Sequence, residues 1–296
     1  MTGVMGLPYL GGVRITHSYF SADYSGYAPQ FSELKGYLGQ AEANKFNGYV
    51  GRLGYMLDQI MNDCGVFVYY GIEDVQAKIR PSHTALTGAG AEGEAGNGTK
   101  RITRRIYEAG YDFSYADAED MVSAAESIGS GAGNTGAAEI SGCKVEVIII
   151  PGLDVMREEA LSALVKLKKA GIPVFFLNKL PMYGTGENAS ISVNAKGFTP
   201  CSEDELMDSL RNNNGFAGGF TAESDAMLIK GRFNKNGREM WLILNNTRKP
   251  AEVTLDHKTK RQASLYNPMD GSISRVVMGN AVRIESYRGI FIVFDC

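Results

Sequence analysis

The stretch VEVIIIPGLDVMREEALSALVKLKKAGIPVFFLN, residues 145–178, decides the fold. The apolar run from Lys144 to Ile150 predicts a buried strand. Met156 to Ala170 has the spacing of an amphipathic helix, with glutamates in its first turn, lysines in its last and Gly171 as its stop. Ile172 to Leu177 predicts a second buried strand. Strand, helix and strand joined by short turns form a right-handed βαβ unit, which predicts an open α/β domain built on a parallel sheet.

The residues on either side extend this pattern. Cys64 to Tyr70 is another short, wholly apolar run, typical of a buried parallel strand. Ser202 with Glu205 three residues later predicts a capping box at the start of a helix. A further helix, beginning near Ala41, is indicated by apolar residues at helical spacing: Phe46, Tyr49, Val50, Leu53, Met56, Leu57 and Ile60. Helices are also predicted over 101–109, 117–127 and 202–212.

The last part of the chain has a different pattern. Short strands are predicted over 226–233, 240–245, 251–255, 262–266, 272–277, 281–285 and 289–294. Turn residues such as Asn236-Gly237 and Asp270-Gly271 separate them. Short strands at regular spacing with such turns predict a β-sandwich. The expected fold class is therefore α/β, a flavodoxin-like open parallel sheet followed by an all-β sandwich domain.

Composition excludes several classes of function. The 296 residues carry 30 basic and 33 acidic side chains, so the basic surface of a nucleic-acid-binding protein is not expected. No apolar run approaches the length of a membrane span, and we expect a cytoplasmic protein with no membrane partner. The four cysteines form no CxxC pair and are expected to be free thiols. Three scattered histidines leave no metal-binding spacing, so no metal is predicted.

Two glycine patterns are candidates for a nucleotide site. GxGxxG occurs at Gly88 to Gly93 and again at Gly131 to Gly136. A phosphate site of this type needs a strand directly before the glycines and a helix directly after them, and neither run has a convincing strand before it. We interpret both as surface loops, and no cofactor is predicted. The chain also lacks GxSxG, which argues against the common serine hydrolases.

Four residues are candidates for contact with a ligand. Glu73 and Asp74 follow the 64–70 strand, at the edge where an α/β sheet binds its ligands. The alternative is that they cap a loop, and adjacent carboxylates cannot flank one glycosidic bond as acid and nucleophile. His17 ends a short strand and is followed by Ser18, Tyr19 and Phe20, a mixture suited to stacking on and hydrogen-bonding a sugar, although His17 is equally compatible with a histidine satisfied within a loop.

Taken together, these parts resemble a known family. GVRITHSYF (12–20) and NGYVGRLGY (47–55) resemble the region after the catalytic barrel in large bacterial glycoside hydrolases of the α-L-rhamnosidase type. The 145–178 stretch resembles the flavodoxin-like domain after the barrel in family 42 β-galactosidases, where that domain mediates trimerisation. LYNPMDGSISRV (265–276) and VRIESYRGIFIVF (282–294) resemble the closing β-sandwich of such enzymes.

The resemblance implies a fragment of a bacterial enzyme rather than a whole one. It divides the chain into a remnant of the barrel end (1–40), a flavodoxin-like domain (41–215) and a β-sandwich (216–296). No position matches the catalytic carboxylates of the family, so the chain is expected to be inactive alone. A carbohydrate substrate would be bound through the missing barrel, with His17 and Tyr19 as substrate contacts. The alternatives are a free-standing flavodoxin-like binding or oligomerisation module, with a homo-oligomer as the possible assembly, and a nucleotide-using enzyme built on the glycine loops.

Overall fold

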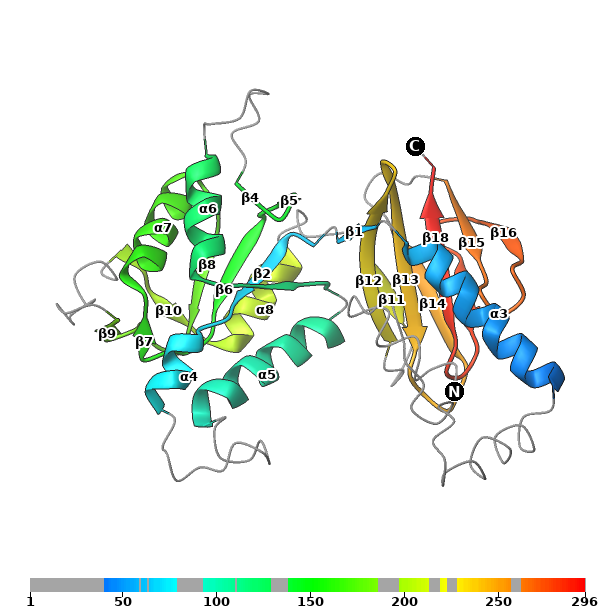
Figure 1. The fold of residues 1–296 in the computed structure, drawn as a ribbon, viewed down its shortest axis with the longest axis horizontal. Coiled ribbons are helices and arrows are strands. Elements are labelled where there is room, and N and C mark those ends of the chain that lie inside the picture. Colours follow the sequence, from blue (N-terminus) through cyan, green and yellow to red (C-terminus); the bar gives the residue numbers. More distant parts are fainter. Residues whose placement is uncertain are drawn as a thin grey trace, which may run out of the picture. The chain divides into compact units, whose positions relative to one another are not determined.

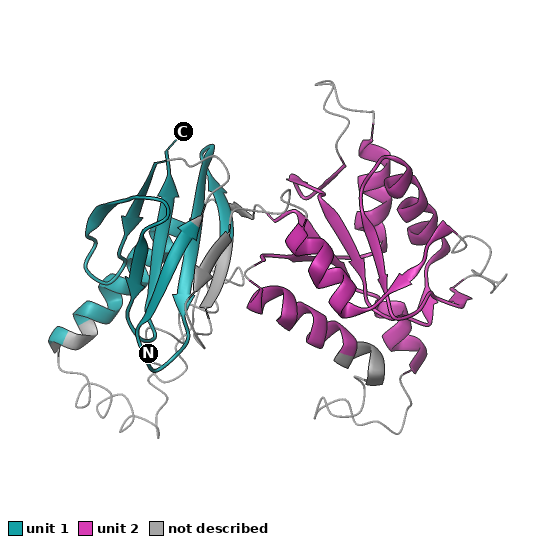
Figure 2. Cartoon of the chain, turned by 180° about the vertical axis from the view of Figure 1, so that it is seen from behind, with its two compact units in different colours: residues 1–62, 218–296 teal, residues 63–217 magenta. Residues whose placement is uncertain are grey.

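The chain forms two compact units in a computed structural model (Figure 2). One unit comprises residues 1–62 with 218–296, and the other comprises residues 63–217. The structure describes residues 40–58, 60–62, 64–78, 93–109, 111–128, 138–185, 197–212, 219–222, 228–256 and 262–295. The α/β part and the β-rich part that the sequence predicts are both present.

The 63–217 unit contains a five-stranded parallel sheet. Its strands are β2 (Val66–Tyr69), β3 (Ser114–Ala116), β6 (Val147–Ile150), β8 (Val174–Leu177) and β10 (Pro200–Cys201). They lie side by side in the order β3-β2-β6-β8-β10, and every neighbouring pair is parallel. Numbered along the chain this order is 2-1-3-4-5, which is the flavodoxin-like arrangement. The predicted fold class is confirmed.

Helices cover both faces of this sheet (Figure 1). α6 (Ala118–Ser127) and α7 (Glu158–Lys169) pack on the face that carries Ile148 and Ile150. α5 (Gly93–Glu108) and α8 (Glu203–Asn212) pack on the face that carries Val147 and Ile149. Since both faces of β6 are buried, the strand has no polar alternation, and this explains the continuous apolar run in the sequence.

The local signals for the helices in this unit agree with the structure. Ser202 and Glu205 form the predicted capping box of α8, with the Glu205 N–H donating to the Ser202 hydroxyl at 3.2 Å and the Ser202 N–H donating to the Glu205 carboxylate at 2.7 Å. Gly171 ends α7 with φ +91, a conformation that glycine adopts without strain. α7 is shorter than predicted at its start, because Val155–Met156 instead form β7, which pairs with β9 (Tyr183–Gly184). A two-stranded hairpin, β4 (Glu139–Ile140) and β5 (Cys143–Lys144), precedes β6.

The other unit is an antiparallel sandwich of two sheets, as predicted. The larger sheet has the order β1-β12-β13-β18-β15-β16 and the smaller one β11-β14-β17. The larger sheet comprises β1 (Met61–Asn62), β12 (Leu228–Lys235), β13 (Arg238–Asn245), β15 (Ala263–Tyr266), β16 (Ile273–Val276) and β18 (Gly289–Phe294). The smaller comprises β11 (Gly219–Ala222), β14 (Ala251–Asp256) and β17 (Ala281–Ile284). Trp241 and Ile292 of the larger sheet pack against Val253 and Ile284 of the smaller one.

A helix covers the outer face of the larger sheet. α3 (Gln40–Leu57) buries Tyr49, Leu53 and Leu57 against β12, β13 and β18. The 41–215 assignment made from the sequence places this helix with the parallel sheet, whereas it packs on the sandwich. An apolar helix face predicts burial but not the surface that buries it, and this accounts for the difference.

The predicted barrel remnant (1–40) lies outside the described residues apart from Gln40, the first residue of α3. His17 and Tyr19 lie outside the described residues as well. So do the glycine-rich run 131–136 and residues 88–92 of the first run, whose last glycine, Gly93, is the first residue of α5. Among the helices that the structure describes, none is long and apolar enough to cross a membrane.

Candidate functional site

The strand order defines a crevice at one edge of the parallel sheet. After β2 the chain adds β3 on one side, and then crosses to add β6 on the other side of β2. Ligands of open α/β sheets bind at this switch point, outside the carboxyl ends of the two central strands. The segment after β2 contains α4 (Ile72–Lys78), and the segment after β6 contains Asp154 and Arg157. These two segments supply most of the charged residues of the site, and Lys179 after β8 and Glu119 on α6 add to them.

Gly71 allows the two segments to approach closely. A Cβ at this position would lie 2.6 Å from Cδ1 of Leu153, which follows β6 and is itself buried. A larger residue there would require the buried Leu153 side chain to move. The constraint is steric and not conformational, since the φ angle of Gly71 is not among the positive ones.

Asp74 joins the two segments. Its side chain is fully buried, and its Oδ1 accepts hydrogen bonds from the backbone N–H groups of Asp154 (2.8 Å) and Val155 (3.1 Å). Its Oδ2 accepts from Nζ of Lys78 at 2.7 Å. A carboxylate that receives two backbone donors and one ammonium is held in a single position. Asp74 therefore fixes the turn after β6 against α4.

Asp154 is paired with two lysines, one of which it shares with Asp74. Nζ of Lys179 lies 2.5 Å from its Oδ1, and Nζ of Lys78 lies 2.8 Å from its Oδ2. The hydrogen bonds from Lys179 and Lys78 hold the pKa of Asp154 below its ordinary value, against the opposing effect of burial. The carboxylate is ionised at neutral pH and has no proton to give as an acid.

Glu73 lies next to Asp74 in the sequence but has a different environment. Its Oε1 accepts from the Tyr69 hydroxyl at 3.4 Å and lies 3.2 Å from Nε of Arg157. Burial raises the pKa of the Tyr69 phenol, and the neighbouring Glu73 raises it further, so the phenol stays protonated and donates. The other carboxylate oxygen of Glu73 is buried and accepts no hydrogen bond from any described residue.

Arg157 is shared among three carboxylates. Besides Glu73 it contacts Glu119 at 2.5 Å and Glu159 at 3.7 Å, both through Nη1. One guanidinium therefore faces three negative charges, and this part of the crevice carries an excess of negative charge.

A cavity of about 630 Å³ opens at this place. Its polar lining residues are Glu73, Gln76, Arg157, Glu159 and Thr185, and Ala77 and Val155 add apolar surface. The volume is within the range of small-molecule sites, about 300–1,000 Å³. An anion such as a phosphate does not fit here, because two glutamates line the cavity and its one guanidinium is already paired. Among the described residues, no group of His, Cys, Asp and Glu side chains has the arrangement of a metal site.

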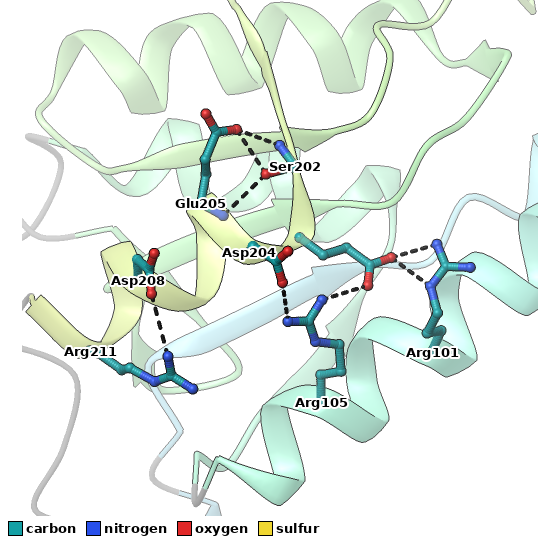
Figure 3. Close-up of polar contacts among 8 residues, drawn as sticks. Arg101, Arg105, Ser202, Asp204, Glu205, Asp208 and Arg211 are labelled. Atoms are coloured by element: carbon teal, nitrogen blue, oxygen red, sulfur yellow. Dashed lines mark hydrogen bonds and ion pairs between the residues drawn. The ribbon is translucent and has the colours of Figure 1, made fainter.

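A second group of charges connects α5 and α8 (Figure 3). Glu203 forms ion pairs with Arg101 at 2.5 Å and with Arg105 at 3.0 Å. Arg105 also forms an ion pair with Asp204 at 2.6 Å. The two arginines hold the pKa of Glu203 below its ordinary value, Arg101 most strongly. Arg101, Arg105, Glu203 and Asp204 are each paired with an opposite charge, so these contacts attach one helix to the other.

Of the four candidate residues named from the sequence, Glu73 and Asp74 are among the described residues. Glu73 and Asp74 lie just after the carboxyl end of β2, where the sequence put them, but a ligand role for them stays a prediction. Asp74 acts as the structural cap that the alternative interpretation described. Asp154, Arg157 and Lys179 are not among the candidates named from the sequence, because each belongs to the site only through its partners. The available signal was that charged residues of opposite sign follow successive parallel strands.

The fold places the chain among flavodoxin-like α/β proteins that carry a β-sandwich. No family model matches the sequence, and no curated protein matches it. Many solved structures share the arrangement of this chain, and three glycosidases are representative. A rhamnosidase from Novosphingobium sp. PP1Y superposes on 99% of this chain and 29% of its own, with 15% identity and a TM-score of 0.63.

The other two structures are also glycosidases by name. An α-L-fucosidase isoenzyme 2 from Paenibacillus thiaminolyticus matches 100% of this chain and 57% of its own, with 11% identity and a TM-score of 0.55. A β-galactosidase from Bacillus circulans sp. alkalophilus matches 93% of this chain and 46% of its own, with 10% identity and a TM-score of 0.54. The chain therefore spans less than two thirds of each of these proteins, and at these identities the likeness is one of fold.

Proposed function

We propose that this chain is an accessory portion of a glycoside hydrolase, the part that follows the catalytic barrel, and that it does not hydrolyse glycosides by itself. The observation that carries the proposal is the alignment of both units, over 99% of the chain, with 29% of a rhamnosidase. Two further glycosidases share the same arrangement over part of their length. The α/β unit and the sandwich would then support a catalytic domain supplied elsewhere.

The charged groups at the switch point favour a non-catalytic role. Hydrolysis of a glycosidic bond needs two carboxyl groups on opposite sides of that bond, one of them able to give a proton. Asp74 is occupied by two backbone donors and Lys78, and Asp154 is ionised between two lysines. Glu73 has one oxygen that accepts no hydrogen bond from a described residue, but its neighbour Asp74 cannot act as the opposing group because its oxygens are already engaged.

The test is a hydrolysis assay on the purified chain. The substrates are the 4-nitrophenyl glycosides of α-L-rhamnose, β-D-galactose and α-L-fucose, with an active glycosidase in parallel to show that the assay detects turnover. We expect no release of nitrophenol above the rate in buffer. Sustained turnover of any of the three that co-purifies with the chain and disappears in Glu73→Gln would refute the proposal.

A second candidate is a binding or oligomerisation module, and the open edge of the parallel sheet favours it. β3 is an edge strand, and Tyr115 on it is 50% exposed. Tyr70, 48% exposed, contacts Tyr115 edge-on with ring centroids 5.8 Å apart. Exposed aromatic residues at the edge of the sheet, as the described residues form it, suit contact with another protein surface. Light scattering during size-exclusion chromatography tests this: assembly through the edge gives a multiple of the 32.0 kDa mass that Tyr115→Ser reduces to one, and a monomeric wild type excludes it.

A further inference from the structure

Two of the four cysteines lie against each other inside the 63–217 unit. Cys64 lies just before β2, and Cys143 is the first residue of β5, in the hairpin that precedes β6. Their side chains are in hydrogen-bond contact, although they are far apart in the sequence. Both are buried, with 4% and 7% of their surface exposed, and both are thiols in this structure. The fold therefore creates a pair of neighbouring thiols that no local sequence motif indicates.

The backbone holds the two cysteines next to each other. The carbonyl of Gly65, the residue after Cys64, accepts hydrogen bonds from the N–H groups of Glu146 and Val147 at 2.9 and 3.0 Å. Cys143 lies just before these two residues in the same segment. β2 and β6 continue this pairing as parallel neighbours. The contact between the thiols thus follows from the register of the two central strands.

The surroundings of the pair favour a disulfide over other uses of two thiols. Among the described residues, no His, Asp, Glu or third Cys joins them in an arrangement that could hold a metal ion. Contact with the Cys143 thiol and burial raise the pKa of Cys64, and the Ser114 hydroxyl offsets only part of this. A thiol that stays protonated at neutral pH is a poor nucleophile, so a catalytic role does not fit. Joining the two sulfur atoms needs no third residue.

We propose that Cys64 and Cys143 form a site of reversible oxidation, at which a low-molecular-weight disulfide such as oxidised glutathione converts the two thiols into an intramolecular disulfide. In the first step the thiolate of one cysteine attacks the reagent, which forms a mixed disulfide and releases one molecule of reduced glutathione. The second cysteine then attacks the mixed disulfide and releases the other molecule. The protein loses two electrons and two protons, and the reagent takes them up as it is reduced to two thiols.

Access to the buried sulfur atoms comes from the hairpin. β4 and β5 have two residues each, and the turn between them contains Ser141 and Gly142, both with positive φ. A hairpin of this size opens at a lower free energy than the central strands, and opening exposes Cys143. Oxidation of the folded protein is therefore expected to be slow but not blocked.

The disulfide would attach the hairpin to the start of β2. It closes a loop of about 80 residues that contains α4, α5, β3 and α6. A crosslink of this kind restricts the unfolded chain more than the folded one, so oxidation stabilises the 63–217 unit. Because the two effects belong to one thermodynamic cycle, folding favours the disulfide by the same factor by which the disulfide favours folding.

Equilibration of the full chain in glutathione redox buffers tests the proposal. Samples reach equilibrium both from the reduced, folded protein and by refolding from urea in the same buffer, so slow opening of the hairpin does not decide the result. Iodoacetamide traps the remaining thiols, and mass spectrometry of tryptic peptides identifies the linked cysteines. We expect a disulfide between Cys64 and Cys143 that dithiothreitol reverses.

The same titration in concentrated urea measures what the fold contributes. At the midpoint, the ratio of the squared concentration of reduced glutathione to that of oxidised glutathione should be at least about tenfold higher in native buffer than in urea. Absence of the disulfide in native buffer, or equal midpoint ratios with and without urea, would overturn the proposal.

Variants assign the disulfide to this pair. Cys64→Ser and Cys143→Ser should each prevent it and abolish the difference in melting temperature between oxidised and reduced samples, which is about 3–5 °C for a tenfold preference. That difference is taken within one variant, so the stability of the variant itself does not enter. Cys201→Ser is the control, because Cys201 packs on the opposite face of the sheet, and it should leave the disulfide unchanged. A disulfide to Cys201, or a melting difference that persists without Cys64, would contradict the assignment.

Discussion

Replacing Asp74 tests how the segments that follow the two central strands, β2 and β6, are held together. Asp74→Ala removes three charge-assisted hydrogen bonds and leaves the N–H groups of Asp154 and Val155 without an acceptor. Each unsatisfied donor costs about 1–3 kcal/mol when it is buried. Lys78 is 31% exposed and keeps its contact with Asp154, so the loss of its second partner adds little. We therefore expect the free energy of unfolding of the 63–217 unit to fall by about 3 kcal/mol.

Asp74→Asn, which keeps the size of the side chain, separates the contribution of the two backbone donors from that of the charge opposite Lys78. Asp74→Asn keeps an oxygen in place for the two N–H groups and loses only the charge opposite Lys78, so we expect a cost of about 1 kcal/mol. For a domain of this size 1 kcal/mol corresponds to about 2–4 °C in melting temperature, so the alanine variant should melt about 6–12 °C lower.

Circular dichroism at 222 nm follows the unfolding of the helices, mainly α4 to α8 of the 63–217 unit with a contribution from α3. Fluorescence of Trp241, the one tryptophan in the chain, follows the β-rich unit separately. Asp208→Ala is the matched control, because Asp208 is 68% exposed and, among the described residues, forms an ion pair only with Arg211 on the same helix; we expect it to change stability by less than about 0.5 kcal/mol. A loss below about 1 kcal/mol for Asp74→Ala, or equal losses for alanine and asparagine, would refute the assigned role of the two backbone donors.

Three further predictions concern other parts of the chain. Leu53→Ala removes a fully buried side chain from the contact between α3 and the larger sheet, and should destabilise the β-rich unit by about 2–5 kcal/mol in urea unfolding followed by tryptophan fluorescence. Gly171→Ala places a Cβ on a residue with φ +91 and should cost about 1–2 kcal/mol in chemical unfolding followed at 222 nm; a neutral effect would contradict the assigned helix end. Asp154→Asn should lower stability at pH 7. Because the folded-state pKa of Asp154 lies below its unfolded value, the difference from the wild type should be complete above about pH 5 and disappear as the pH falls below about 4. Urea titrations across this pH range measure it.

Local sequence patterns predicted the elements well. The 145–178 stretch contains a complete βαβ unit, and its periodicity, charged helix ends and Gly171 each depend on neighbouring residues only. The β-strands of the sandwich were located by the same means, with Asn236-Gly237 at the hairpin between β12 and β13. In β13 all but the first residue are buried, because one side faces the smaller sheet and the other faces α3.

The sequence did not predict which elements pack against one another. Glu73 and Asp74 were found because they follow a strand directly. Lys78 is one helical turn from Asp74 on α4, but Asp154 and Arg157 come into contact with Asp74 and Glu73 only because β2 lies next to β6, and strand order is not encoded in any local window. For the same reason the burial of α3 was predictable and its sheet was not.

The discontinuity of the β-rich unit has a consequence for synthesis on the ribosome. α3 leaves the ribosome before the whole of the 63–217 unit, and β12, the first long strand of its sheet, comes after that unit. Roughly 170 residues lie between them, so at about 5–20 residues per second the wait lasts about 10–35 s. During that time Tyr49, Leu53 and Leu57 have no sheet to cover them, while the parallel sheet already has all its strands. The nascent chain therefore presents an uncovered amphipathic helix for chaperones to recognise, and the order of synthesis makes the intervening unit the first to complete its fold.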